Sequence, residues 1–370
     1  MAGAAPATPA APADRHVLRA PLSPRAARAL GPTGEMRGMA INDVGFGNRG
    51  IAAATVDFPR MAAEGITSVS VYVYLYLASP TGTVVSTGVY TPTDQELELV
   101  ADAAKANGLD VHLTPVLLDG TNGWRGRYVP SNLDAFFASY TAQLVKYADL
   151  AQRLGVTLFY VGSENEQIAG RTAQWLAAIG AVRQHFHGAL AYMSTPYTAT
   201  NVKFWDALDI AGISAYFSLA ADDNPSYNRF LAAWREVHTP FVRDLAKRIR
   251  TPLVYAEVGY HSQQQAFANP AEAPPTGTLP APAAQGDAYA ALLDVLKANP
   301  LVYGVTWWRW APGTTAADTS YSPNGKPAEC ALASRWSRDP QVRAAATSEP
   351  TCDLHALDAA VAKVTGIVPR

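Results

Sequence analysis

Cysteine is nearly absent from this sequence, which has only Cys330 and Cys352 among its 370 residues. The two have neither CxxC spacing nor the spacing of zinc ligands. We expect a single disulfide between them near the C-terminus, with two unrelated free thiols as the alternative. A disulfide would indicate an oxidising compartment. We therefore expect a secreted protein, although residues 1–12 lack the pattern of an intact signal peptide.

An excess of charge of either sign is also lacking, since 29 Lys and Arg stand against 31 Asp and Glu, for a net charge of −2. A nucleic-acid-binding protein would be expected to have a basic excess. No apolar run reaches the roughly 18 residues that a membrane span needs. Nucleic acid and a membrane span are therefore not among the expected partners. We expect the chain to act as a monomer.

Several signatures of catalysis are missing as well. The sequence has no P-loop and no GxSxG nucleophile turn, and its histidines have neither HExxH nor another metal-ligand spacing. Nucleophilic serine, phosphate-loop and zinc chemistry therefore have little support. We expect neither a cofactor nor a metal ion.

What the sequence does have is a regular alternation of β-like and helical segments. The β-like segments span residues 36–42, 66–77, 109–118, 156–162, 188–194, 208–216, 251–257 and 301–308, and helical spacing recurs at 93–108, 132–155 and 288–300. Eight such units predict an α/β fold, a (β/α)₈ TIM barrel. An open doubly wound sheet is the alternative, because a glycine-rich stretch (42–50) follows the first strand. The second strand, however, is not followed by the acidic residue that binds the ribose of a dinucleotide in such folds.

Composition divides the chain into three parts. Residues 1–33 are rich in Ala and Pro and predict a flexible leader. Residues 34–336 form the predicted barrel, a single catalytic domain. Residues 337–370 form a short C-terminal extension, which a Cys330–Cys352 disulfide would staple.

Two carboxylates stand where the active face of such a barrel should be, at the carboxyl ends of strands. Glu164 follows the fourth predicted strand and Glu257 ends the seventh. Glycosidic cleavage uses such a pair, held about 5–5.5 Å apart in retaining enzymes and about 6.5–9.5 Å apart in inverting ones. We predict Glu164 as the acid/base and Glu257 as the nucleophile. Glu166 is a rival acid, or else a substrate contact or the start of a helix.

Further polar and aromatic side chains lie near the predicted strand ends. Only one of two consecutive residues on a strand can face the lumen, so one of the tryptophans at 307 and 308 should underlie the sugar while the other packs. Tyr216 is either a donor to the nucleophile or a core residue, and the 124–125 pair either contacts the glycan or anchors its loop. The candidate substrate-binding residues are Asn42, Asp119, Trp124, Arg125, Glu166, Tyr216, Tyr260, Trp307 and Trp308.

At these residues the chain resembles glycoside hydrolase clan A, and within it family 113, whose characterised members are β-mannanases. The resemblance lies in FYVGSENE (159–166), PLVYAEVGYHS (252–262), GVTWWRW (304–310) and DGTNGWRG (119–126). It implies a retaining, endo-β-1,4-mannanase-like hydrolase of a polysaccharide or oligosaccharide. A hydrolase of a different bacterial or plant β-glycan and a non-catalytic carbohydrate-binding barrel are the alternatives.

Overall fold

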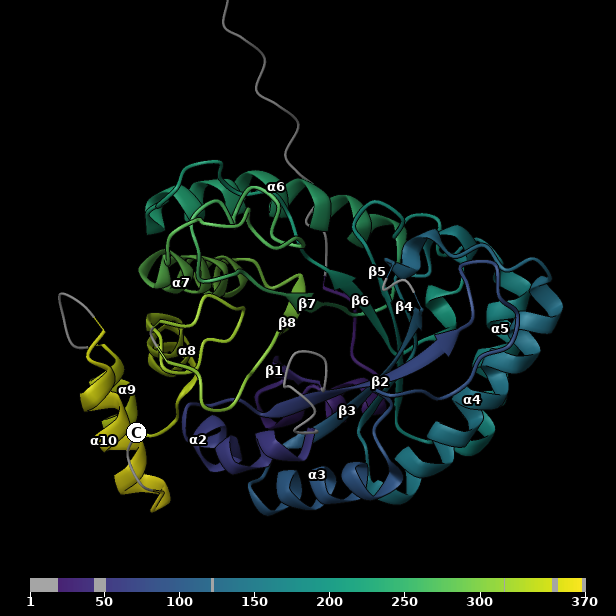
Figure 1. Cartoon of the computed structure of the whole chain (residues 1–370), viewed down its shortest axis with the longest axis horizontal. Helices are drawn as coiled ribbons and strands as arrows, with labels where there is room; N and C mark the ends of the chain where they lie inside the picture. Colours follow the sequence, from purple (N-terminus) through teal and green to yellow (C-terminus); the bar gives the residue numbers. More distant parts are fainter. Residues whose placement is uncertain (1–18, 43–50, 121–122, 316, 348–351, 368–370) are drawn as a thin grey trace, which may run out of the picture.

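The computed structural model describes residues 19–42, 51–120, 123–315, 317–347 and 352–367. Eight parallel strands pair in chain order and close between β8 and β1, with helices around them (Figure 1). The strands are β1 (Met36–Ile41), β2 (Ser68–Leu77), β3 (Asp110–Asp119), β4 (Leu158–Ser163), β5 (Ala189–Ser194), β6 (Ile210–Ser214), β7 (Leu253–Val258) and β8 (Val302–Trp307). All eight predicted strands, and the TIM barrel, are confirmed.

Two of the helices that surround the strands have clear end signals. In α3 (Asp94–Ala106), Thr93 and Glu96 form a capping box, and α4 (Leu133–Leu154) ends at Gly155, whose φ of 73° suits a glycine. The other barrel helices are α2 (Phe58–Ala63), α5 (Thr172–His185), α6 (Tyr227–Arg248), α7 (Pro282–Ala298) and α8 (Pro327–Trp336). Within the described ranges no helix is long and apolar enough to cross a membrane.

Pro115 lies in the middle of β3. β3 pairs with β2 along its whole length but with β4 only at His112 and Leu113. Beyond Leu113 the strand therefore has one free edge, where a residue without an N–H is tolerated. The carboxyl-terminal half of β3 is thereby separated from β4 at the mouth of the barrel.

The prediction of a flexible leader over residues 1–33 is wrong for the part that the structure describes. Residues 24–29 form α1 (Pro24–Ala29), which Ser23 caps by accepting from the Ala26 backbone N–H. Ala26, Ala29 and Leu30 are buried against the inner layer of the barrel, among residues near the strand starts. The Ala-rich composition supplies small apolar side chains that close this end of the barrel. Residues 1–18 lie outside the described residues.

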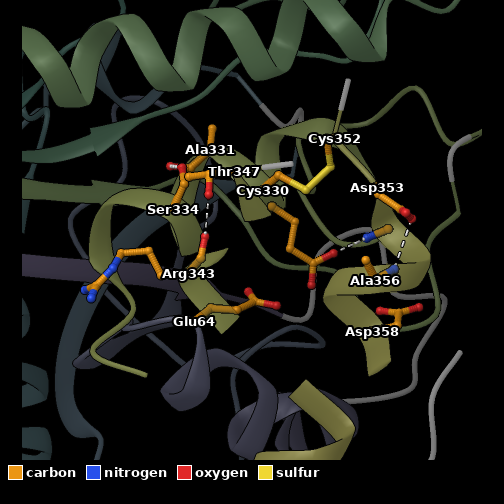
Figure 2. Close-up of a disulfide and its surroundings, with 12 residues drawn as sticks. Glu64, Cys330, Ala331, Ser334, Arg343, Thr347, Cys352, Asp353, Ala356 and Asp358 are labelled. Atoms are coloured by element: carbon orange, nitrogen blue, oxygen red, sulfur yellow. Dashed lines mark hydrogen bonds between the residues drawn. A yellow bond between two sulfur atoms is a disulfide. The ribbon is translucent and has the colours of Figure 1, made fainter. Parts of the chain in front are cut away.

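The C-terminal extension is attached to the barrel by covalent and ionic contacts. Cys330 on α8 and Cys352 form a disulfide with a Cα–Cα distance of 6.0 Å, just before α10 (Leu354–Thr365), and the other helix of the extension is α9 (Pro340–Ala346) (Figure 2). Arg60 on α2 pairs with Glu329 on α8 and Asp358 on α10, and all three side chains are buried. A buried charge is stable only when paired, so this cluster fixes the extension against α2 and α8.

Candidate active site

The two glutamates predicted as catalytic lie at the same end of the barrel. Glu257 is a residue of β7, and Glu164 directly follows β4. Glu164 has a φ of 51°, in the left-handed region that costs a residue with a side chain about 1–3 kcal/mol. Its backbone N–H donates to the Met193 carbonyl on β5 over 2.7 Å, which holds this conformation. Strain held in this way at a strand end is a feature of functional sites.

Glu257 is held between two tyrosine hydroxyls. Tyr72 on β2 donates to its Oε2 over 2.6 Å, and Tyr216, after β6, donates to its Oε1 over 2.8 Å. Both carboxylate oxygens are therefore oriented before any substrate arrives. This confirms the expectation that Tyr216 donates to the carboxylate of Glu257.

The surroundings of Glu257 make its ionised form costly. Burial, together with the negative charge of Glu164, raises the pKa of Glu257 to about 7. Arg125 and the hydrogen bonds from Tyr72 and Tyr216 act in the opposite direction. The charge of Glu164 therefore acts on Glu257, and Arg125 lies in the field of both carboxylates.

Glu164 is held by donors of a different kind. The indole N–H of Trp124 donates to its Oε2 over 2.9 Å, and a guanidinium nitrogen of Arg125 lies 3.0 Å from the same oxygen. Both donors meet the same carboxylate oxygen, Oε2. The contact differs from the pair of hydroxyls at Glu257, so the two carboxyl groups have distinct environments.

Arg125 connects the loop after β3 to the end of β4. Besides its contact with Glu164, it donates to the carbonyl of Ser163 over 3.0 Å and to the Ser163 hydroxyl over 2.9 Å. Burial lowers its pKa, but the charges of Glu164 and Glu257 outweigh burial and raise it. Arg125 therefore anchors its loop through a backbone carbonyl, as the alternative interpretation expects. Its guanidinium also lies in the field of both carboxylates.

A cavity of about 350 Å³ opens beside Glu257. It is lined by Tyr72, Tyr74, Tyr90, Val116, Leu118, Arg125, Glu257 and Trp308. These residues come mainly from β2, β3 and the segments after them, together with the end of β8. The mixture of aromatic walls and a few polar groups is typical of a small-molecule site.

The two consecutive tryptophans divide as their alternation predicts. Trp308 lines the cavity and packs edge-to-face against Tyr72, with ring centroids 4.8 Å apart. Trp307 is fully buried and stacks on Tyr289, with centroids 3.6 Å apart and an interplanar angle of 8°. Trp308 is therefore the tryptophan that faces the site, and Trp307 packs in the core.

Three other candidates lie in supporting positions. Asn42 is fully buried, where it donates to the Tyr74 hydroxyl over 3.0 Å and accepts from Arg309 over 2.8 Å. Asp119 is buried and accepts from the backbone N–H of Gly123 over 3.1 Å, which shapes the loop that carries Trp124. Asn42 and Asp119 therefore position site residues, and their own side chains are enclosed.

Two further candidates lie away from the cavity. Tyr260 is fully buried and packs against Phe267 and Tyr289, so it does not line the cleft as expected. Glu166 begins a short 3₁₀ turn, and its Oε1 accepts from the hydroxyls of Thr195 and Thr198. Its carboxylate therefore faces the loop after β5, which argues against the alternative in which Glu166 is the acid.

Sequence reasoning missed Tyr72 and Tyr74. They alternate with apolar residues on β2, so they share one face of that strand, and with Val116 and Trp308 they form a cluster at the mouth. The signal was present as the alternating tyrosines of residues 72–76. It required knowing which face of β2 points into the lumen.

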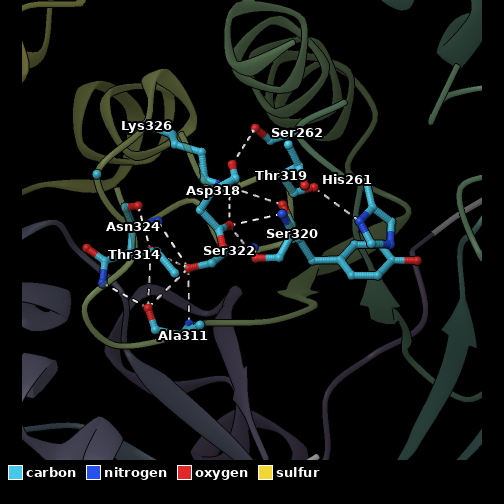
Figure 3. Close-up of polar contacts among 12 residues, drawn as sticks. His261, Ser262, Ala311, Thr314, Asp318, Thr319, Ser320, Ser322, Asn324 and Lys326 are labelled. Carbon is cyan, nitrogen blue, oxygen red and sulfur yellow. Dashed lines mark hydrogen bonds and ion pairs between the residues drawn. The ribbon is translucent and has the colours of Figure 1, made fainter. Parts of the chain in front are cut away.

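The loop after β8 brings one more tyrosine to the site. Its polar network centres on the buried ammonium of Lys326, which donates to the carboxylate of Asp318 and the carbonyl of Ser320, each over 3.0 Å (Figure 3). Tyr321, next in this loop, contacts His261 with ring centroids 3.9 Å apart. Burial and, to a smaller extent, the charge of Glu257 raise its pKa, and its hydroxyl donates to the Pro270 carbonyl over 2.8 Å.

Among the described residues, no group of three or more His, Cys, Asp or Glu side chains could hold a metal ion. The site chemistry that can be derived from these residues is that of two carboxyl groups and their hydrogen-bond donors.

Comparison with known proteins gives a consistent picture. The family model described as Glycoside Hydrolase Family 113 matches residues 47–326. Among solved structures, the GH113 β-mannanase AaManA from Alicyclobacillus acidocaldarius, in complex with ManMIm, is 27% identical with a TM-score of 0.71, over 81% of this chain and 96% of that one. A GH113 β-1,4-mannanase in a complex structure is 22% identical with a TM-score of 0.68, over 82% and 99% of the two chains, and supports the fold. No curated protein sequence matches the chain.

Proposed function

Since this chain belongs to glycoside hydrolase family 113, we propose that it is an endo-β-1,4-mannanase that retains the anomeric configuration, with Glu257 as nucleophile and Glu164 as acid/base. The observation that carries the proposal is the pair of carboxyl groups at one barrel mouth, each held by its own donors. The 27% identity to a β-mannanase over 81% of this chain supports mannan as the substrate.

The first step forms a covalent intermediate. A carboxylate oxygen of Glu257 attacks the anomeric carbon while the bond from that carbon to the leaving oxygen breaks. Glu164 gives its proton to the leaving oxygen, so that the released sugar departs as an alcohol. The product of this step is a glycosyl ester of Glu257 and an ionised Glu164.

The second step restores both groups. Glu164 takes a proton from water, whose oxygen attacks the anomeric carbon and displaces the Glu257 carboxylate. Two displacements at the same carbon retain its configuration. The tyrosines at 72 and 216 support both steps, because their hydroxyl hydrogen bonds stabilise Glu257 when it is charged and keep it aimed at the carbon.

The organisation of the chain supports three further parts of the proposal. We assign the catalytic domain to residues 34–336, with the helix α1 as its closure, and a docked extension to residues 337–370. The Cys330–Cys352 disulfide is consistent with an extracellular protein. The monomeric state is part of the same proposal.

A digest of a glycan panel tests the proposal. Purified protein is incubated with β-1,4-mannan, glucomannan, xylan, β-1,4-galactan and a soluble cellulose, and reducing ends are measured. Mannan or glucomannan should be cleaved fastest, and NMR of the earliest products should show the β-anomer. Early α-anomer would contradict retention, and faster cleavage of another glycan would contradict the mannan assignment. Binding without cleavage of any glycan would instead support a non-catalytic carbohydrate-binding barrel.

A further inference from the structure

In the part of the chain that the structure describes, most large aromatic side chains are buried or half-buried. Among the described residues, the exposed large apolar side chains include just two aromatic ones, Trp124 at 42% and Tyr197 at 81% relative exposure. Single exposed apolar residues are common and need no explanation. Here both lie at the mouth of the barrel, on the loops that follow β3 and β5, the two strands that flank β4. Their loops therefore follow the two strands on either side of β4, the strand that Glu164 directly follows.

We infer that Trp124 and Tyr197 form the platform that binds the leaving-group sugars of a β-linked glycan, and that Glu166 is the positioning residue for the Tyr197 loop. This inference rests on the proposed function. It adds a binding surface for the leaving-group sugars, which the cavity beside Glu257 does not provide. The aromatic rings offer flat apolar surfaces with a polar edge. Such a surface suits the apolar face of a β-linked hexopyranose.

Trp124 is fixed in place rather than free in solvent. Its indole N–H is bound to Glu164 over 2.9 Å. The ring packs directly on the backbone at Gly126, where a Cβ would lie 2.4 Å from an indole carbon. A side chain at this position would displace the ring. The exposed part of the indole is thus held beside the carboxyl group that protonates the leaving oxygen.

Tyr197 stands at the tip of a turn that is fixed on both sides. Backbone N–H groups of residues 198 and 199 donate to the carbonyl of Thr195 over 3.3 and 3.1 Å. The hydroxyls of Thr195 and Thr198 lie 3.1 Å apart, and both meet Oε1 of Glu166. Ala199 is buried and its carbonyl accepts from the indole of Trp205 over 2.9 Å. The backbone that carries the exposed ring is therefore already ordered, so binding does not have to order this turn.

The position of the cavity decides which part of the substrate the two rings would contact. The cavity beside Glu257 is lined by residues from the β2, β3 and β8 side and by none from the loops after β4, β5 or β6. The sugar that is attacked by Glu257 fits there. Beyond Glu164 the chain of sugars continues across the end of β4 towards the loop after β5. The leaving-group sugars therefore pass Trp124 and Tyr197.

The test compares substrates with and without a leaving-group sugar. For Tyr197→Ala, kcat/KM on mannan oligosaccharides should fall about three- to tenfold, the range of an aromatic stacking contact. Hydrolysis of a mannosyl fluoride, whose leaving group is a single atom, should be unchanged. Tyr197→Phe should keep oligosaccharide activity, because the ring remains. Leu176→Ala, which removes a 45%-exposed side chain from α5, is the matched control and should leave both substrates unaffected.

Glu166→Ala tests the positioning role with a different readout. It should raise KM for oligosaccharides while leaving fluoride hydrolysis and the alkaline limb of the pH profile unchanged. Loss of that alkaline limb would mean that Glu166 is the acid, and would overturn its positioning role.

Equal loss by Tyr197→Ala on both substrates, or none on either, would overturn the platform while leaving the proposed function intact. If the wild-type protein cleaves no glycan, the proposed function fails. Oligosaccharide binding to wild type and Tyr197→Ala, measured by titration calorimetry, then decides the platform by itself, since equal affinities would refute it and weaker binding by the variant would support it.

Discussion

Replacing Tyr72 by phenylalanine should move the acidic limb of the pH profile to higher pH. The Tyr72 hydroxyl donates to Glu257 over 2.6 Å, and both side chains are buried. This donor favours the ionised carboxylate, so its loss should raise the pKa of Glu257 above the present value of about 7. Because the proposed nucleophile acts only when ionised, the variant needs more alkaline conditions.

The size of the effect follows from the energy of one hydrogen bond. A hydrogen bond to a charged group contributes about 1.5–3 kcal/mol, and about 1.36 kcal/mol corresponds to one pH unit. The acidic limb of kcat/KM should therefore move upward by about one to two pH units. Tyr216 still donates to the other oxygen, so the carboxylate should keep its orientation.

The assay is kcat/KM against pH for an aryl glycoside with a good leaving group, which needs little proton donation from Glu164. Tyr140→Phe is the matched control: its buried hydroxyl donates to the Val161 carbonyl over 3.0 Å, so the variant loses a buried hydrogen bond without touching Glu257. The control should keep the wild-type limb. An unchanged limb in Tyr72→Phe, or one moved to lower pH, would refute the reasoning.

Four further predictions concern the carboxyl pair and the disulfide. Glu257→Ala should lower turnover by orders of magnitude with an unchanged circular dichroism spectrum, whereas Glu164→Ala should lose far less on activated aryl glycosides than on glycans; similar losses on both substrates would contradict the acid role. The pKa of Glu257 is about 7 in the folded protein, against an ordinary 4.5. The neutral carboxyl therefore contributes its full share of folding stability below pH 4.5, and this contribution is lost as the pH rises through 7. Glu257→Gln should therefore gain up to about 3 kcal/mol over wild type above pH 7 and little in acid, measured by urea unfolding; a gain that is the same at both pH values would contradict this. Removing the disulfide with Cys330→Ser and Cys352→Ser should cost about 3 kcal/mol for a separation of 22 residues, and an unchanged melting temperature would show that the extension is held without it.

Local patterns in the sequence determined the strands and the two glutamates. Short runs rich in β-branched and aromatic residues, separated by helical spacing, are typical of parallel β/α units, and the structure has all eight strands. Glu164 and Glu257 could be proposed as catalytic because the catalytic groups of this fold stand at strand ends. Which sequence positions end a strand is a local property, so one sequence was sufficient.

The tertiary structure alone decided which side chains face the cavity. Irregular pairing of β7 with β6 and β8 shifts the register near Glu257 and Trp307. Simple alternation along the sequence therefore does not tell which of these side chains point into the cavity. Tyr72 reaches Glu257 across 185 residues of sequence, while Tyr260 turns into the core. Contacts of this kind depend on strand twist and closure, which no local window contains.

The same holds for segments whose composition suggested no structure. The Ala-rich residues 24–29 fold because the end of the barrel offers an apolar surface for Ala26 and Ala29. Glu166 resembles a catalytic residue in sequence, but the neighbouring turn supplies two hydroxyls that engage its carboxylate. The sequence therefore determined the elements and the chemical groups at their ends, whereas long-range packing decided the partners of each group, because those partners come from other strands.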